Sequence, residues 1–187
     1  MEKLEAWEFH ESKDDQSADH RHSPNRPIPW EHLKDLGVIC WKMDVESKAT
    51  LEKMKQERGY HYSETVTVAP GVLEGYEERT RQFYEEHLHP YPESRLVLDG
   101  SGYWDVRDYD GKWIRFHVQK GHLIVLPPGM YHRFTLDHKG YIQALLLYSS
   151  YPKRIEVLRP FGDDLQARKD YVKTILTKVH SKEICKC

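Results

Sequence analysis

Short runs of apolar residues alternate with charged and turn-forming stretches along most of the chain. Runs rich in β-branched and aromatic residues, bounded by glycine or proline, are typical of β-strands. By this criterion we expect strands at residues 5–9, 37–43, 62–68, 87–89, 95–100, 102–107, 112–118 and 122–126, with a further strand at His132. The strand at residues 95–100 is predicted to end in a turn at Gly100. Many short strands at close spacing predict a mainly β fold that closes into a barrel.

Three segments have the charged composition and sparse apolar positions of surface helices, at residues 30–36, 48–58 and 76–86. The polar, proline-containing stretch at residues 10–29 is expected to be a flexible loop. A length of 187 residues suits one domain with a single core. We therefore expect one domain over residues 1–187, a barrel with peripheral helices, which ends in a polar tail near residues 180–187.

The charge balance narrows the class of partner. The chain has 28 Lys and Arg against 30 Asp and Glu, a formal net charge of −2, so it has no global field to attract nucleic acid or an anionic membrane. No apolar run approaches the roughly 18 residues of a membrane span, and the acidic N-terminus lacks the apolar core of a signal peptide. We expect a small-molecule partner, no nucleic acid and no membrane span.

Cysteine usage indicates a reducing compartment. The odd number of cysteines, with Cys40 in an apolar run and Cys185 and Cys187 in a polar tail, does not suit a disulfide framework. We expect a cytoplasmic monomer and leave the nucleus open as a second location. The last three residues are similar to the Cys-x-Cys prenylation ends of some small GTPases, but without a membrane signal we expect an unmodified thiol-bearing tail.

The candidate chemistry lies between His87 and His132. His87 and His89 are two residues apart, so on a strand both imidazoles point to the same side. A proline-rich turn follows, after which Glu93 opens the next extended run and can face the two histidines. In a barrel, the strand that begins at His132 returns beside the first one. The spacing therefore predicts a metal site formed by His87, His89, Glu93 and His132.

Three imidazoles and one carboxylate favour a first-row divalent ion such as Fe(II), Ni(II), Co(II) or Mn(II), since no thiolate is present to select zinc or copper(I). We expect one ion per chain. An octahedral ion with four protein ligands keeps two positions free, which a substrate or oxygen can occupy.

Strand parity adds a further residue to this candidate site. Arg95 lies two residues beyond Glu93 and should share its face of the strand, where a guanidinium can bind an anionic, oxygen-rich substrate. The alternative is a structural ion pair with an acidic neighbour. Four aromatic residues nearby are expected to belong mainly to the core, with one or two lining a pocket: Trp104, Trp113, Phe116 and Phe134. His20 and His22 repeat the His-x-His spacing outside any strand, and we expect them to be solvated.

The pattern His-x-His-x3-Glu, followed by a Pro-Pro-Gly turn with a histidine three residues after the glycine, resembles the two metal motifs of the cupin barrel, a jelly-roll or double-stranded β-helix. Within the cupins, the chain resembles the acireductone dioxygenases of methionine salvage. The resemblance covers most of the chain and is carried by the segments at residues 36–38, 41–44, 83–89, 99–108, 112–115 and 131–137.

This resemblance implies that His87, His89, Glu93 and His132 bind the metal and that Arg95 steadies the substrate. The implied substrates are O2 and an acireductone, 1,2-dihydroxy-5-(methylthio)pent-1-en-3-one. With Fe(II) the family forms 4-methylthio-2-oxobutanoate and formate; with Ni(II) it forms 3-(methylthio)propanoate, formate and carbon monoxide. The ion would act as a Lewis acid that stabilises and orients the electron-rich enediolate, which can itself reduce oxygen.

The chain departs from the usual family residues at Tyr91, Pro92, Ser94, His122, Leu146 and residues 149–154. These departures make the substrate less certain than the metal. Two other interpretations therefore stay open: a metal-binding cupin with weak or lost catalysis that acts as an interaction or sensory protein, and a cupin isomerase or dioxygenase for another small substrate.

Overall fold

The computed structural model describes residues 3–184 of the chain. Its strands are β1 (Ala6–Glu8), β2 (Ile39–Lys42), β3 (Tyr62–Val68), β4 (His87–Leu88), β5 (Glu93–Arg107), β6 (Trp113–Gln119), β7 (His122–Leu126), β8 (His132–Leu136), β9 (Ile142–Tyr148) and β10 (Val157–Leu158). The helices are α1 (Trp30–Asp35), α2 (Lys48–Glu57), α3 (Tyr76–Tyr84), α4 (Gln166–Tyr171), the π-helical segment η1 (Val172–Leu176) and α5 (Thr177–Ile184). The three predicted helices and most of the predicted strands are confirmed, with small shifts at their ends. The strands predicted at residues 95–100 and 102–107 are one strand, β5, and neither β9 nor β10 was predicted.

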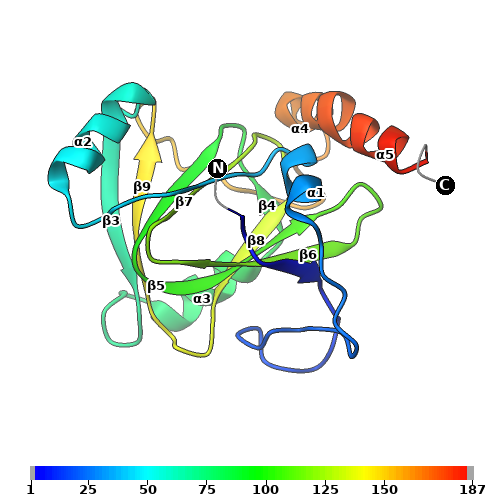
Figure 1. Ribbon diagram of the computed structural model, residues 1–187, viewed down its shortest axis with the longest axis horizontal. Coiled ribbons are helices and arrows are strands. Elements are labelled where there is room, and N and C mark those ends of the chain that lie inside the picture. Colours follow the sequence, from blue (N-terminus) through cyan, green and yellow to red (C-terminus); the bar gives the residue numbers. More distant parts are fainter. Residues whose placement is uncertain (1–2, 185–187) are drawn as a thin grey trace.

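The long strand β5 organises the barrel, because its two halves belong to two antiparallel sheets. Its first half lies between β7 and β9, whose outer neighbours are β2 and β3. Its second half lies between β6 and β8, in the order β1-β6-β5-β8-β4-β10. Figure 1 shows the strands wrapping around one interior, with α2, α3 and the C-terminal helices at the periphery. This is the predicted mainly β barrel with peripheral helices.

The expected turn at Gly100 is wrong, since β5 continues through it. Gly100 has a φ of 75° and lies just after a register shift between Val97 and Asp99. A Cβ at this position would collide with the backbone oxygen of Tyr141. Glycine therefore allows a bend and a close approach of chains within one strand, which lets β5 pass from the first sheet to the second.

The barrel interior is filled by apolar side chains from both sheets. Val97 and Phe116 are fully buried there, and Leu33 of α1 belongs to the same cluster. A second cluster on the outer side of the first sheet packs Leu96 and Leu123 under Met54 of α2. Full burial of one such side chain contributes about 1.5–3 kcal/mol, so both faces of β5 are held firmly where it carries the candidate site.

The segment between β1 and α1 contacts the barrel through two isolated bridges, Trp7 with Pro27 and Phe9 with Arg21. The prediction that His20 is solvated is wrong. His20 is 6% exposed, stacks on Phe9, and its ring nitrogens lie 3.0 and 3.1 Å from backbone carbonyl oxygens. Burial of the ring against Phe9 and an N–H donated to a backbone carbonyl can fix a loop that has no regular hydrogen bonding of its own.

The C-terminal helices were not predicted from the sequence. They pack on the barrel through the buried residues Tyr171, Leu176 and Val179, and the Tyr171 hydroxyl donates to the Leu36 carbonyl at 2.9 Å. The expected polar tail begins inside α5, and Cys185 and Cys187 lie outside the described residues. Between residues 3 and 184, no helix is both long and apolar enough to cross a membrane.

Candidate metal centre

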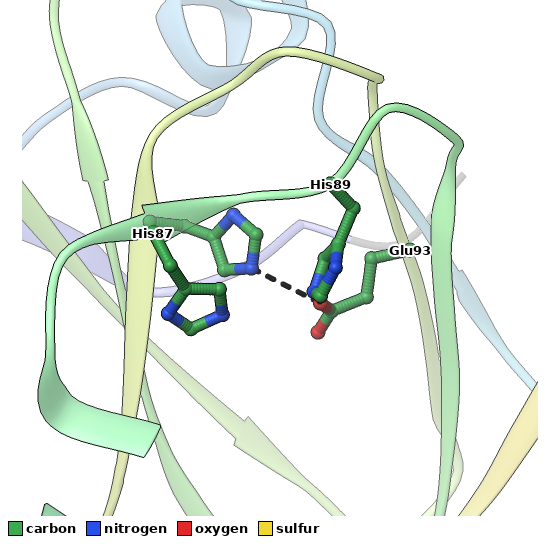
Figure 2. Close-up of side chains that lie close together, drawn as sticks. His87, His89 and Glu93 are labelled. Carbon is green, nitrogen blue, oxygen red and sulfur yellow. Dashed lines mark hydrogen bonds and ion pairs between the residues drawn. The ribbon is translucent and has the colours of Figure 1, made fainter. Parts of the chain in front are cut away.

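The structure brings the four predicted ligands together. His87 in β4 is directly opposite His132 at the start of β8, and Glu93 is the first residue of β5. Ligand atoms of these three residues and of His89 all lie within 4.8 Å of one another, and all four residues are buried. Figure 2 shows the side chains of His87, His89 and Glu93 pointing toward one another.

Each histidine is oriented by a hydrogen bond from Nδ1 to a backbone carbonyl. The distances are 2.7 Å from His87 to Glu85, 2.7 Å from His89 to Ile155, and 3.0 Å from His132 to Met130. A carbonyl oxygen only accepts, so Nδ1 carries the proton in all three rings. The Nε2 lone pairs are thereby left for the centre of the group, as expected for metal-binding histidines.

The donor set fits a divalent cation. Nε2 of His89 and Nε2 of His132 lie 2.9 and 3.0 Å from the same oxygen of Glu93. A neutral imidazole has one N–H, which the backbone carbonyls already engage, so a cation between these nitrogens and the carboxylate would satisfy atoms that neutral rings leave unpaired. Two imidazolium rings only 5.3 Å apart would repel each other, whereas one divalent ion satisfies all the atoms with neutral rings.

Burial and neighbouring charges shift the pKa values of three of the ligands. Burial acts to lower the pKa of His89, but the Glu93 carboxylate more than offsets this effect and raises it, so a metal ion competes with a proton for this imidazole. Burial lowers the pKa of His87 to about 3, helped by the neighbouring His132, so this imidazole is neutral at pH 7. Burial acts to raise the pKa of Glu93, but Arg95 and His132 more than offset this effect and hold that pKa well below its usual range. Glu93 is therefore an anionic ligand although it is buried.

A cavity of about 220 Å³ opens beside the four ligands. Its apolar wall includes Val66, Phe83, Phe134, Ile142 and Leu146. Arg95 also lines the cavity, 15% exposed, with Nε 3.7 Å from Glu93 Oε1 and a hydrogen bond of 3.0 Å to the Ser94 carbonyl. The predicted parity of Glu93 and Arg95 is thus observed, and a guanidinium lies next to the ligand group.

The aromatic residues divide as expected between core and pocket. Trp104 and Phe134 line the cavity, whereas Trp113 and Phe116 do not. The Trp104 Nε1–H donates to Glu93 Oε1 at 3.3 Å, a contact that sequence reasoning did not identify. Trp104 is 11 residues beyond Glu93 on the same strand, and the bend in β5 brings it back to the carboxylate.

Sequence reasoning also missed a polar rim on the cavity, formed by Glu64, Tyr91, Tyr148, Arg154 and Glu156. Tyr91 and Arg154 were identified only as departures from the usual residues. The sequence therefore indicated that these two positions are unusual, but it did not indicate that they lie near His89. The other departures have different surroundings: Leu146 lines the cavity, and Ser94 accepts a hydrogen bond from the Tyr60 hydroxyl at 3.0 Å.

No second group of three or more metal-ligand side chains converges within the described part of the chain. His20 and His22 do not form such a group. His22 lies 3.1 Å from Glu8 through Nε2, and His20 is engaged by backbone carbonyls. That this pair binds no metal stays a prediction.

The fold and the His3Glu group define a metal-binding cupin-type barrel. A solved acireductone dioxygenase from Bacillus anthracis, with a cadmium ion in its active centre, has the same fold: the TM-score is 0.64 at 17% identity, over 83% of this chain and 98% of that one. The model of the ARD/ARD' family matches residues 5–156.

Relatives of known name extend over nearly the whole chain. The acireductone dioxygenase of Monodelphis domestica is 43% identical over 178 residues, 94% of this chain and 99% of that protein. The acireductone dioxygenase 1 of Physcomitrium patens is 44% identical over 184 residues, 97% of this chain and 94% of that protein. The chain belongs to the ARD/ARD' family. The predicted family and the predicted enzyme class, a metal-dependent dioxygenase, are confirmed.

Proposed function

We propose that the protein cleaves the acireductone 1,2-dihydroxy-5-(methylthio)pent-1-en-3-one with O2, in methionine salvage. The observation that carries this proposal is the buried His3Glu group beside Arg95, in the lining of a cavity that also has apolar side chains. Membership in the ARD/ARD' family supports the reaction class.

His87, His89, Glu93 and His132 would hold one Fe(II) or Ni(II) ion per chain, and other first-row divalent ions suit the same donors. When bound, the ion supplies Lewis-acid stabilisation to the enediolate. The backbone carbonyls on the three Nδ1 atoms orient the imidazoles and leave the Nε2 lone pairs for the metal. The protein thus directs one carboxylate and three imidazoles toward the metal position before any substrate arrives.

Arg95 would bind and orient the anionic end of the substrate. Its side chain is mostly shielded from solvent, so its charge acts through a lower dielectric than at the surface. The apolar lining residues, among them Phe83, Phe134 and Leu146, would receive the methylthio tail and exclude water from the enediolate. The cavity therefore offers a charged group for the reacting oxygens and apolar side chains for the tail.

The metal is proposed to determine the products. The Fe(II) form would give 4-methylthio-2-oxobutanoate and formate, and the Ni(II) form 3-(methylthio)propanoate, formate and carbon monoxide. The test is to load metal-free protein anaerobically with each ion, add acireductone and oxygen, and identify the products by mass spectrometry and headspace analysis. Identical products from both forms would refute metal control. The cytoplasmic location and the monomeric state stay predictions.

The alternatives are a cupin without catalysis and a cupin isomerase or dioxygenase for another small substrate. An isomerase would consume no oxygen, a binding protein would hold metal without forming products, and a dioxygenase for another substrate would leave acireductone at its spontaneous rate of oxidation. Oxygen consumption that tracks acireductone consumption one to one, well above the spontaneous rate, would exclude all of them.

A further inference from the structure

Residues 149–156, here called the strap, connect β9 to β10 without regular secondary structure. Arg154 and Glu156 of the strap line the cavity beside the metal ligands. At its far end the chain enters β10, whose Leu158 is the register partner of His87. The strap therefore runs along the candidate site and is joined at one end to a strand that carries a ligand.

The strap supplies the orienting acceptor for only one of the three histidines. His87 and His132 donate to carbonyls two residues away in their own chain segments. His89 instead donates to the carbonyl of Ile155, 66 residues further along the chain, at 2.7 Å. The ring orientation of His89 thus depends on where the strap lies, whereas the other two orientations are set locally.

Tyr91 holds Ile155 in the position that this hydrogen bond needs. The Ile155 backbone N–H donates to the Tyr91 hydroxyl at 2.8 Å, and that hydroxyl lies 3.4 Å from the Ile155 carbonyl. The Tyr91 ring also stacks on the His89 imidazole, with centroids 5.4 Å apart and an angle of 17° between the planes. One side chain therefore contacts both the ligand and the backbone that orients the ligand.

A second contact holds the strap one residue earlier. Arg154 has a φ of 49°. This left-handed conformation is unfavourable for any residue other than glycine, and it persists where surrounding contacts enforce it. Its guanidinium lies 2.6 Å from Glu64 of β3. Glu64 thereby fixes the strap to the first sheet directly beside Ile155.

We propose that Tyr91, assisted by the Glu64–Arg154 ion pair, is a positioning residue for the metal ligand His89, acting through the backbone of Ile155. This inference rests on the proposed role of His89 as a metal ligand. It goes further in assigning metal retention to the strap, a segment whose residues at 149–154 differ from those usual in the family. Loosening the strap should weaken metal binding before any substrate is present.

The test is the affinity of metal-free protein for Ni(II) alone, measured by competition with a chelator of known affinity. Tyr91→Phe keeps the stacked ring and removes the hydroxyl that holds Ile155. Loss of a group that orients a metal ligand typically costs about 10- to 100-fold in metal affinity, so we expect the dissociation constant to rise at least about 10-fold. The exposed Glu64–Arg154 ion pair is a weaker contact, so Arg154→Ala should raise the dissociation constant for Ni(II) only about 2- to 5-fold.

Two matched controls separate positioning from general damage. Tyr60→Phe removes a hydroxyl that donates to Ser94 of β5 rather than to the strap, and Lys153→Ala removes an exposed positive charge from the strap itself. Both should bind Ni(II) as the wild type does. The visible absorption spectrum of Co(II)-loaded protein supplies a second readout. A reoriented His89 changes the ligand field of the ion, and this change is measured without any activity assay.

The outcomes distinguish this inference from the proposed function. If Tyr91→Phe binds Ni(II) within twofold of Tyr60→Phe and its Co(II) spectrum is unchanged, the positioning role is refuted while the ligand assignment stands. If His89→Ala retains wild-type Ni(II) affinity, the ligand assignment itself fails. Circular dichroism and thermal unfolding of each metal-free variant identify any variant that has lost the fold. For a variant with lower stability, the Co(II) spectrum of its folded, loaded fraction gives the answer.

Discussion

Substitution of Arg95 tests most directly whether the cavity binds the negative charge of its substrate. Its guanidinium lies close enough to the ligand group to affect whatever binds there: Nε is 3.7 Å from Glu93 Oε1, and the side chain is 15% exposed. A cation at this position repels a metal ion and attracts an anion bound beside it. Arg95→Ala should therefore leave metal content near wild type and lower turnover per bound metal.

The magnitude follows from the position of the charge. Two unit charges about 4 Å apart interact by about 4 kcal/mol at an effective dielectric constant of about 20, which sets the upper end of the loss. Water entering the space vacated by the side chain would recover part of this energy. A net loss of about 1.4–4 kcal/mol corresponds to a decrease of about 10- to 1000-fold in kcat/KM. Arg95→Lys should restore only part of the rate, because lysine keeps the charge but not the planar fork.

The assay is metal analysis and oxygen uptake on the same preparation, with Lys153→Ala as the control that removes an exposed cation. Wild-type turnover in Arg95→Ala would refute the reasoning and leave Arg95 as an ion-pair partner of Glu93. Arg107 and Arg115 could not then take over, since they pair with Glu86 and Asp105 and do not line the cavity. Among the described residues that line it, Arg79 and Arg154 are the remaining arginines.

Three further predictions concern metal binding and stability. His89→Ala and Glu93→Ala should each sharply lower metal content and abolish the stabilisation by added metal, whereas exposed His138→Ala should do neither; full occupancy in either ligand variant would contradict the assignment. Burial lowers the pKa of His122 to about 4, so the unfolded chain binds a proton between pH 6.5 and 4 that the folded chain does not. The free energy of unfolding should therefore decrease as the pH is lowered through this window, by about 2 kcal/mol from pH 7 to pH 5. In urea unfolding of metal-free protein, His122→Asn should lose less free energy of unfolding than the wild type over this pH range. If the wild type and the variant lose stability in parallel as the pH falls, the proposed role of His122 is refuted. Gly129→Ala should cost about 2–4 kcal/mol, since φ is 77° and the new Cβ would collide with the backbone of α4; an unchanged melting temperature would argue against that packing.

Local rules predicted the ligand group well because its geometry is largely local. Two-residue spacing places His87 and His89 together, and the parity of Glu93 and Arg95 follows from the same strand rule. The arrival of His132 beside His87 depends on barrel closure, which the spacing of strands and turns also indicated. These relations need only the pleat of a strand and the order of the strands.

The parts that could not be predicted depend on contacts between distant segments. The expected turn at Gly100 failed because a glycine with positive φ serves equally in a turn and in a bend within a strand. His20 was expected to be solvated because the loop around it has no periodic pattern, yet two backbone carbonyls hold it. The Ile155 carbonyl that orients His89 leaves no trace in side-chain patterns, since any residue can supply a carbonyl.

Acireductone-dependent oxygen uptake tests the central claim most directly. Metal-free protein is loaded with one equivalent of Fe(II) under nitrogen, mixed with acireductone and oxygen, and followed with an oxygen electrode. Glu93→Ala, given the same Fe(II), provides the matched control, and its rate sets the contribution of free metal and spontaneous oxidation. The proposed function predicts that the wild type consumes oxygen and acireductone one to one, well above that control. Equal rates in the two preparations, with metal bound in the wild type, would contradict it.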